Sequence, residues 1–263
     1  MNTQNSQSSP GIDSFFDQSL VTILVSSCDR YSDLWLPFFN LYKRFFPAAT
    51  RIFLINEKKS FDFENVVSLK LGGDKDWSSL LVEALENVST EYVLFTLEDF
   101  FIYKPVDLIK LGSLIELMNG HKLNMIRLVR RPGSNIPSHI SSKLMSIPPG
   151  ADYRVSTQVA LWKVSILKSI LKNGESAWEF EINGTKRAMK YVGFFCVSTD
   201  AFPYKHHVVE RGKWFPWSAY YYSRMKIGVD LNSRSVMSLF ECIVWFAKKI
   251  VGTLKNKIKS NKI

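Results

Sequence analysis

Residues 91–103 (EYVLFTLEDFFIY) have the pattern of a buried strand that ends in two adjacent carboxylates, Glu98 and Asp99. Residues 92–95 are aromatic, β-branched or aliphatic, and the chain is apolar again over 100–102. A short apolar run of this kind is typical of a buried strand. Because burying an unpaired carboxylate costs several kcal/mol, the pair predicts a compensating cation, either a metal ion or a metal bound to a diphosphate. The alternative is that one carboxylate caps a helix and the other pairs with an arginine.

Further apolar runs alternate with segments of helical spacing along the chain. Strands are expected at 20–26, 51–56, 66–71, 125–129 and 153–162, and helices at 34–46, 78–88, 104–118 and 163–171. Alternation with short connections indicates an α/β fold, with a mostly parallel sheet flanked by helices on both faces. The stretch 130–152 is rich in Pro, Gly and Ser without a sustained period, and a loop of this length is expected to be functional or mobile.

The composition is that of a folded protein with an anionic partner. The 263 residues are 46% hydrophobic and 14% aromatic, which excludes an intrinsically disordered chain. Three cysteines are too few for a disulfide framework or a Cys-based zinc site, and they favour a reducing compartment. The net charge of +10 favours nucleic acid, a phosphate-bearing ligand or an anionic membrane as partner. No nucleic-acid-binding module is recognisable, so the last two remain.

The C-terminal segment 235–258 has the pattern of a basic amphipathic helix. About half of the excess positive charge lies in 240–263, where six lysines face one glutamate. One helical face carries the apolar residues, with Trp245 near its boundary: Val236, Leu239, Phe240, Ile243, Ala247, Ile250, Val251, Leu254 and Ile258. Such a helix suits an anionic membrane surface. The alternative is a helix docked on the core of its own domain or on a second subunit.

Three segments are expected along the chain. Residues 1–19 are a flexible polar tail in which Phe15 and Phe16 are candidates to dock on the domain. Residues 20–232 form the α/β domain, and residues 233–263 form the basic helix. The N-terminus lacks the order of a secretion signal, and no apolar run is long enough to span a bilayer. The expected location is therefore cytoplasmic, peripheral on the inner face of the cytoplasmic membrane.

Polar clusters at the ends of the expected elements carry a family resemblance. They lie at 27–30, 73–77, 98–99, 153–158 with Trp162, and 178–181. In this order they resemble a GT-A-type glycosyltransferase, the nucleotide-sugar-dependent kind found in bacterial surface-polysaccharide gene clusters, over residues 20 to 225. The resemblance implies a GT-A-like, Rossmann-type sheet. It also implies transfer of a hexosyl unit from a nucleotide-diphosphate sugar to a glycan acceptor, presented as a lipid-linked glycan in lipopolysaccharide or related polysaccharide synthesis.

The resemblance also assigns residues to the donor. Asp29 would contact the base or ribose while Ser27 lines the pocket, and Asp76 and Trp77 would complete the nucleoside site. For the latter pair the alternative is a helix N-cap followed by a buried aromatic residue. Arg30 would neutralise the leaving diphosphate if the reaction is metal-independent, together with Lys75, Arg130, Arg187 or Lys213.

Glu98 and Asp99 stand in the place of the Asp-x-Asp motif of the family, whose carboxylates bind Mg²⁺ or Mn²⁺ bridging the diphosphate. Oxygen ligands suit these hard ions. Adjacent residues of a strand point to opposite sides, so only one of the two is expected to reach the metal, and we choose Asp99.

Acceptor-side roles fall on residues 178–187. Glu179 resembles the base of inverting members, which takes the proton of the attacking hydroxyl, and Glu181 is the alternate base. Trp178 would stack on an acceptor sugar, and Arg187 would contact the acceptor or the diphosphate. The alternative is a strand that exposes Glu179 and Glu181 to solvent.

Two other functions compete with sugar transfer. A nucleotidyltransferase also builds an acidic site on a parallel sheet, but it would carry a Gly-rich, basic phosphate loop after the first strand, which Ser26-Ser27-Cys28-Asp29 does not resemble. A catalytically silent, membrane-associated scaffold with the same fold is the second.

Overall fold

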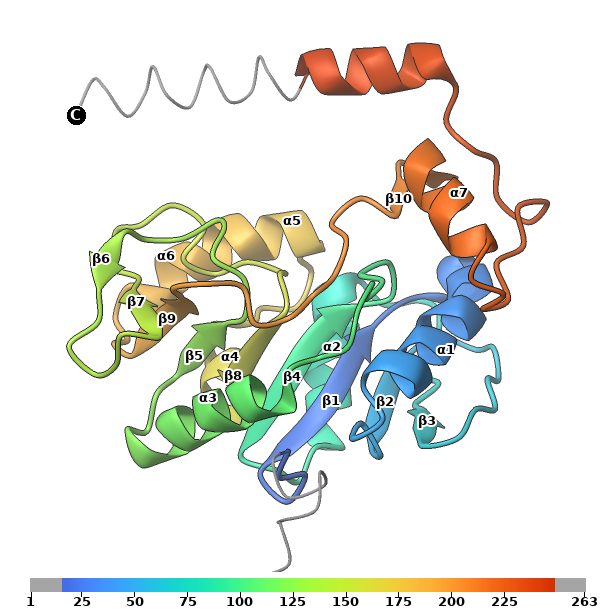
Figure 1. The fold of residues 1–263 in the computed structure, drawn as a ribbon. Helices are drawn as coiled ribbons and strands as arrows, with labels where there is room; N and C mark the ends of the chain where they lie inside the picture. Colours follow the sequence, from blue (N-terminus) through green and yellow to red (C-terminus); the bar gives the residue numbers. More distant parts are fainter. Residues whose placement is uncertain (1–15, 249–263) are drawn as a thin grey trace, which may run out of the picture.

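The computed structural model describes residues 16–248, which form a nine-stranded sheet with helices on both faces (Figure 1). The strands lie in the order β3-β2-β1-β4-β8-β5-β9-β7-β6. Their bounds are β1 Val21–Ser26, β2 Ile52–Ile55, β3 Val66–Ser68, β4 Tyr92–Leu97, β5 Met125–Arg127, β6 Ile136–Pro137, β7 Leu144–Ser146, β8 Ala160–Lys163 and β9 Phe194–Val197.

Most strands of this sheet run in one direction. β1 pairs in parallel with β2 and β4, β2 pairs in parallel with β3, and β5 pairs in parallel with β9. β8 is antiparallel to both β4 and β5, and β7 is antiparallel to both β6 and β9. Only β7 and β8 are therefore reversed among the nine strands. The predicted α/β class with a mostly parallel sheet is confirmed.

The two faces of the sheet bury separate apolar layers. Helices α1 (Trp35–Phe45) and α3 (Leu108–Gly120) cover one face, and α2 (Trp77–Glu86) and α4 (Val164–Ile170) cover the other. In β4 the side chain of Leu94 packs on the first layer, whereas those of Val93 and Phe95 pack on the second. This alternation follows from the two-residue period of a strand.

Two predicted elements are shorter than expected. Only the last part of the predicted strand at 153–162 is a strand, namely β8. The chain from Tyr153, which has a positive φ of 51°, to Val159 is a loop. The helix predicted from residue 104 begins at Leu108, after Asp107, whose side chain accepts a hydrogen bond from the backbone N–H of Lys110 at 2.9 Å. An Asp N-cap of this kind fixes where a helix starts.

The segment after β9 crosses the carboxyl ends of the central strands. It contains the hairpin of β10 (Val209–Glu210) and β11 (Lys213–Trp214), followed by α7 (Pro216–Ser223). The hydroxyl of Tyr222 donates to the carbonyl of Phe101 at 3.0 Å, and Ile102 forms a β-bridge with Tyr204. This segment therefore closes over the chain that follows β4.

Both ends of the described chain rest on the domain. Phe16 is buried and packs edge-to-face on Phe46, as expected for a docked tail, while Phe15 lies outside the described residues. The predicted helix at 235–258 is present over 239–248, and its remainder also lies outside them. Between residues 16 and 248, no helix is long and apolar enough to cross a membrane. The proposed boundaries at residues 19 and 232 remain predictions.

Candidate functional site

The acidic pair lies in a turn directly after β4, at the carboxyl edge of the parallel strands. β4 ends at Leu97, so strand alternation does not set the directions of Glu98 and Asp99, contrary to the expectation from the sequence. Glu98 is 8% exposed, and Asp99 is half-buried. The carboxyl edge of an open α/β sheet is where ligands bind in such folds.

The electrostatics of this pair disfavour two negative charges. Burial, reinforced by the charge of Asp99, raises the pKa of Glu98 well above its usual value. Burial likewise raises the pKa of Asp99 to about 7, and the charge of Glu210 adds to the effect. The charge of the Arg234 guanidinium lowers the pKa of both groups, but both values stay above the usual range. A cation delivered to this turn would offset the cost of ionising the pair.

Basic side chains gather in a polar cavity of about 490 Å³ next to the β1 end of this site. Its walls include Arg30, Lys59 and Arg234. The Arg234 guanidinium donates to both carboxylate oxygens of Asp33, at 2.7 and 2.8 Å, and lies 4.5 Å from the ring centre of Tyr31. Arg30 was a candidate from the sequence, whereas Arg234 was not, because 201 residues separate Arg234 from Asp33 and only the fold brings them together.

Asp29 ties the ends of β1 and β2 together. Its carboxylate accepts the backbone N–H groups of Glu57, Lys58 and Lys59 at 2.9–3.1 Å. Burial acts to raise the pKa of Asp29, but these donors outweigh it and lower the pKa. Ser27 is also engaged, since its hydroxyl accepts the indole N–H of Trp35 at 2.7 Å. Both residues lie at the predicted edge and shape the loop there.

Asp76 and Trp77 show the alternative considered from the sequence, a helix N-cap followed by a packed aromatic residue, while their role at a nucleoside stays a prediction. Asp76 is the N-cap of α2 and accepts the backbone N–H of Ser79 at 2.9 Å. Trp77 packs on Phe180, with 5.4 Å between ring centres, and donates its indole N–H to the hydroxyl of Ser26 at 2.9 Å. The indole thus forms a flat wall between the end of β1 and the helix that carries Phe180.

That helix runs from 177 to 188 as α5 (Ala177–Glu179), the π-helical segment η3 (Phe180–Gly184) and α6 (Thr185–Ala188). It is not the strand considered as an alternative from the sequence. π-helical turns are frequent at functional sites. Trp178 is 68% exposed on its first turn, free to meet a ligand from solvent.

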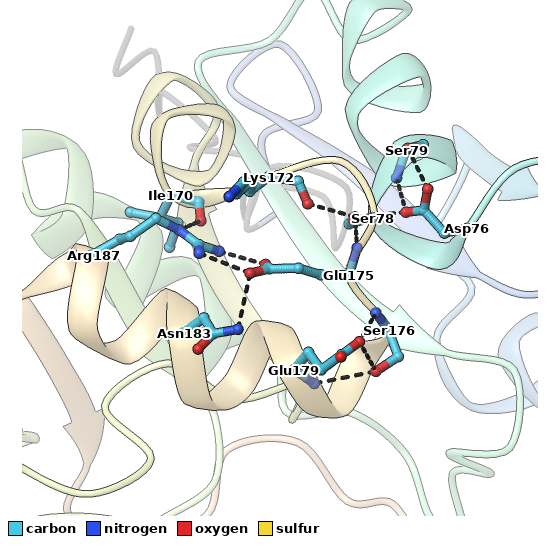
Figure 2. Close-up of polar contacts among 10 residues, drawn as sticks. All are labelled: Asp76, Ser78, Ser79, Ile170, Lys172, Glu175, Ser176, Glu179, Asn183 and Arg187. Carbon is cyan, nitrogen blue, oxygen red and sulfur yellow. Dashed lines mark hydrogen bonds and ion pairs between the residues drawn. The ribbon is translucent and has the colours of Figure 1, made fainter.

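Glu179 forms a capping box at the start of this helix (Figure 2). Its carboxylate accepts the backbone N–H and the hydroxyl of Ser176 at 2.8 and 2.7 Å. The N–H and then the hydroxyl of Ser176 lower the pKa of Glu179. The carboxylate is exposed, so a substrate can reach it, but in this state it serves as a cap.

Arg187 is fixed inside the domain. Its guanidinium donates to both oxygens of Glu175, at 2.8 and 2.5 Å, and to the carbonyl of Ile170 at 2.7 Å (Figure 2). Asn183 also donates to Glu175 at 3.1 Å. These contacts hold the helix against the loop after α4. The N–H groups of Arg187 therefore bond to Glu175 and Ile170, and they do not reach Glu98 or Asp99.

Glu181 faces a large cavity on the other side of the same helix. One carboxylate oxygen accepts the backbone N–H and the hydroxyl of Thr157 at 2.8 and 2.9 Å. The residue lines a space of about 1190 Å³ together with the loop 130–135. Of the two candidate bases, Glu181 is the one held in a wall of this cavity.

A metal ion is compatible with the donor set at the end of β4. Within residues 16–248, no three His, Cys, Asp or Glu side chains are grouped so that they could hold a metal. The protein would therefore supply one or two of the metal's ligands, the carboxylates of Glu98 and Asp99. Mg²⁺ commonly binds in this way, with phosphate oxygens and water completing its coordination.

Comparison with known proteins identifies the fold. No protein-family model matches the chain, and no curated protein sequence is significantly similar to it. Two solved structures of Staphylococcus aureus TarS, residues 1–349, are similar in fold. One has a TM-score of 0.50 and 15% identity; the other, in complex with UDP, has a TM-score of 0.51 and 14% identity. In both cases the similarity covers 84% of this chain and 68% of the other. The chain therefore has the fold of the GT-A-type glycosyltransferases.

Proposed function

We propose that this protein is a glycosyltransferase that moves a hexosyl unit from a nucleotide-diphosphate sugar to a glycan acceptor in surface-polysaccharide synthesis. The observation that carries the proposal is the acidic pair Glu98 and Asp99 after β4, beside the cavity lined by the cations Arg30 and Lys59 and by Arg234, which is paired with Asp33. Carboxylates for a metal and cations for a diphosphate are the complement of such a donor. The bound UDP in the related TarS structure supports a nucleotide ligand.

The donor roles follow from these positions. Asp99, with Glu98 behind it, would hold Mg²⁺ or Mn²⁺, which when bound supplies positive charge to the diphosphate. The indole of Trp77 offers a flat apolar wall to the nucleoside, and Ser27, Asp29 and Asp76 fix the loops around it. Arg30 adds positive charge for the leaving diphosphate.

The acceptor hydroxyl needs a base. In an inverting transfer its oxygen attacks the anomeric carbon, the bond from that carbon to the diphosphate breaks, and the hydroxyl proton passes to a carboxylate. Glu179 is our first candidate because it is exposed at the start of the helix whose Phe180 packs on Trp77. Its capping contact with Ser176 would open when the acceptor binds. Glu181 is the alternate base, and Trp178 would stack on the acceptor sugar.

Release of nucleoside diphosphate from a panel of nucleotide sugars, with and without Mn²⁺, tests this function. We expect turnover with at least one donor. Glu179→Gln should lower turnover by roughly 10²–10⁴-fold while donor affinity is retained. If Glu181→Gln has that effect instead, the alternate base is correct.

Three results would contradict the proposal. The first is that no nucleotide or nucleotide sugar alters the melting temperature or is consumed. The second is pyrophosphate release from a nucleoside triphosphate and a sugar phosphate, which indicates a nucleotidyltransferase. The third is nucleotide binding without turnover of any donor, unaffected by either glutamate variant, which indicates a catalytically silent scaffold.

The acceptor is proposed to be lipid-linked because the helical segment 239–248 keeps its apolar face exposed. Trp245 is 8% exposed and packs on Phe215, while Glu241 pairs with Lys213 at 2.6 Å. At about 100° per residue, Leu239 and Ile243 lie on roughly the opposite side, and both are exposed. The helix therefore docks through its less apolar face, unlike a helix that fills a core.

An anionic membrane surface is the occupant that this face favours. The α7 residues Trp217, Tyr220 and Tyr221 are exposed as well, and aromatic side chains of this kind suit the headgroup region. The sequence after residue 248 adds five lysines. Their charge complements anionic lipids, each nearby lysine contributing up to about 1 kcal/mol.

Vesicle sedimentation separates a membrane from other occupants. We expect binding to vesicles that contain phosphatidylglycerol, weaker binding at high salt, and about tenfold loss in Leu239→Ser/Ile243→Ser. Leu231→Ser is the matched control, an exposed leucine outside the helix. Equal binding of all three proteins, or none to anionic vesicles, would contradict membrane association.

A further inference from the structure

The cavity next to Glu181 is larger than the one beside the acidic pair and is built from different elements. It has a volume of about 1190 Å³ and lies between the loops 130–135 and 149–153 and the helix η3–α6. Its charged lining residues are Arg130, Arg131, Asp152, Glu181 and Lys186. No role in donor binding has been assigned to these five side chains except the diphosphate contact considered for Arg130.

In the described part of the chain, the basic side chains at the rim form no ion pair. Among the described residues, the Arg130 side chain hydrogen-bonds only to the amide oxygen of Asn135, at 3.5 Å. Within residues 16–248, no carboxylate lies within 4.0 Å of Arg131 or Lys186. One carboxylate oxygen of Glu181 accepts both hydrogen bonds from Thr157.

Two further guanidinium groups lie buried behind the cavity wall. Arg127 and Arg154 are each 1% exposed. Arg127 donates to the carbonyls of Pro132, Tyr153 and Arg154, the last two at 2.6 and 3.0 Å. Burial lowers the pKa of Arg127 to about 10, so it stays charged at neutral pH. Because carbonyl oxygens carry only partial charge, its positive charge is not cancelled.

Arg154 repeats this arrangement. It donates to the carbonyls of Ala188 and Tyr191, both at 2.7 Å, and lies 4.2 Å from the ring centre of Phe194. Its Nε has no hydrogen-bond partner within residues 16–248. Both buried arginines hold the segments that wall the cavity: the loop through Pro132, the loop through Tyr153, and the end of α6.

The charge balance of the cavity is therefore positive. Five cations, Arg127, Arg130, Arg131, Arg154 and Lys186, stand against three anions, an excess of two. The anions are Asp152, Glu181 and Asp200, whose carboxylate accepts the backbone N–H of Arg130 at 2.7 Å. Low-dielectric walls concentrate the field of such charges inside a cleft and raise the local concentration of anions. Guanidinium groups bind phosphate and carboxylate strongly.

We propose that this cavity binds a phosphate or carboxylate group of the acceptor, so that the acceptor is an anionic glycan. The inference rests on the proposed function, since sugar transfer is what makes an acceptor site necessary. Phe180, which packs on Trp77 of the donor side, precedes Glu181 of the cavity wall. One helix thus borders both sites, and an acceptor anchored in the cavity would lie along the helix that carries both candidate bases.

Direct binding of small anions tests this site without turnover. The probes are glycerol 3-phosphate, glucuronate and neutral glucose, titrated into the full chain by calorimetry. We expect the phosphate or the carboxylate probe to bind and glucose not to bind. The probe that binds more tightly shows whether the anionic group of the acceptor is a phosphate or a carboxylate. Arg131→Gln/Lys186→Gln should weaken that probe at least tenfold, and added salt should weaken it further.

The controls separate this inference from the proposed function. Lys190→Gln removes an exposed cation from the same end of the helix without touching the cavity lining, and it should bind the probe like the wild type. The melting temperature of each variant shows that it is folded. An anion site that is absent, or equally strong in all variants, would overturn the inference even if nucleotide binding is normal. Loss of nucleotide binding in Arg131→Gln/Lys186→Gln would also overturn it, because the cavity would then belong to the donor.

Discussion

The carboxyl group of Asp99 links stability, pH and metal binding at a single residue. Burial raises its pKa to about 7, above the value of about 3.9 for an unfolded aspartate. The folded state therefore binds more protons than the unfolded state between these values. Stability from this group declines as pH rises from about 4 through about 7. A bound cation would reverse the loss.

Asp99→Asn should consequently raise the melting temperature of the metal-free protein at pH 8, by about 2–4 °C for each kcal/mol gained. At pH 5 the difference from wild type should shrink, because Asp99 is then largely protonated. Mn²⁺ should raise the melting temperature of the wild type and not that of the variant. Calorimetry at both pH values measures this, and a variant less stable than wild type at pH 8 would contradict the assigned pKa.

Variants of Arg187 show whether this residue stabilises the fold or contacts the acceptor. Removing one partner of its ion pair with Glu175 leaves the other charge unpaired in a largely buried place. Arg187→Met and Glu175→Gln should each lower the melting temperature by several degrees, and the double variant should lose less than the sum. An unchanged melting temperature with a raised acceptor KM would instead favour the acceptor role.

At the scale of elements, the start of α2 tests how Asp76 contributes. Its carboxylate caps the helix, and the hydrogen bonds from Ser78 and Ser79 outweigh burial and lower its pKa. Asp76→Ala should cost about 1 kcal/mol of unfolding free energy. Asp76→Ser should retain most of the cap. If both variants lose nucleotide affinity equally at unchanged stability, Asp76 contacts the nucleoside directly.

Elements with strong local signals were predictable from the sequence. β1, β2 and β4 are apolar runs bounded by polar residues, and α1 has a clear helical period ended by Pro47. The loop through Arg154 was not predictable, because Tyr153 has a positive φ and the buried Arg154 guanidinium donates to the carbonyls of Ala188 and Tyr191, contacts that no local pattern records. β10 and β11 have only two residues each, too few to produce a period.

At the scale of the whole molecule, the site depends on contacts that no local pattern records. The sequence located the acidic pair at a strand end, and the structure confirms that position. It did not reveal that Arg234 reaches back to Asp33, or that Arg127 and Arg154 lie behind the cavity beside Glu181. Arg234 reaches Asp33 because the segment after β9 crosses the sheet. Arg127 and Arg154 are brought together with the loop through Tyr153 and the end of α6 before the chain enters β9. Both groupings follow from topology.

A crystal structure with Mn²⁺ and the nucleoside diphosphate that the donor panel identifies would show whether the donor binds at the end of β4. We expect an anomalous manganese peak within coordination distance of a carboxylate oxygen of Asp99 and of the diphosphate. The nucleoside should lie between the end of β1 and Trp77. A diphosphate bound away from the end of β4, or a metal that contacts neither Glu98 nor Asp99, would contradict it.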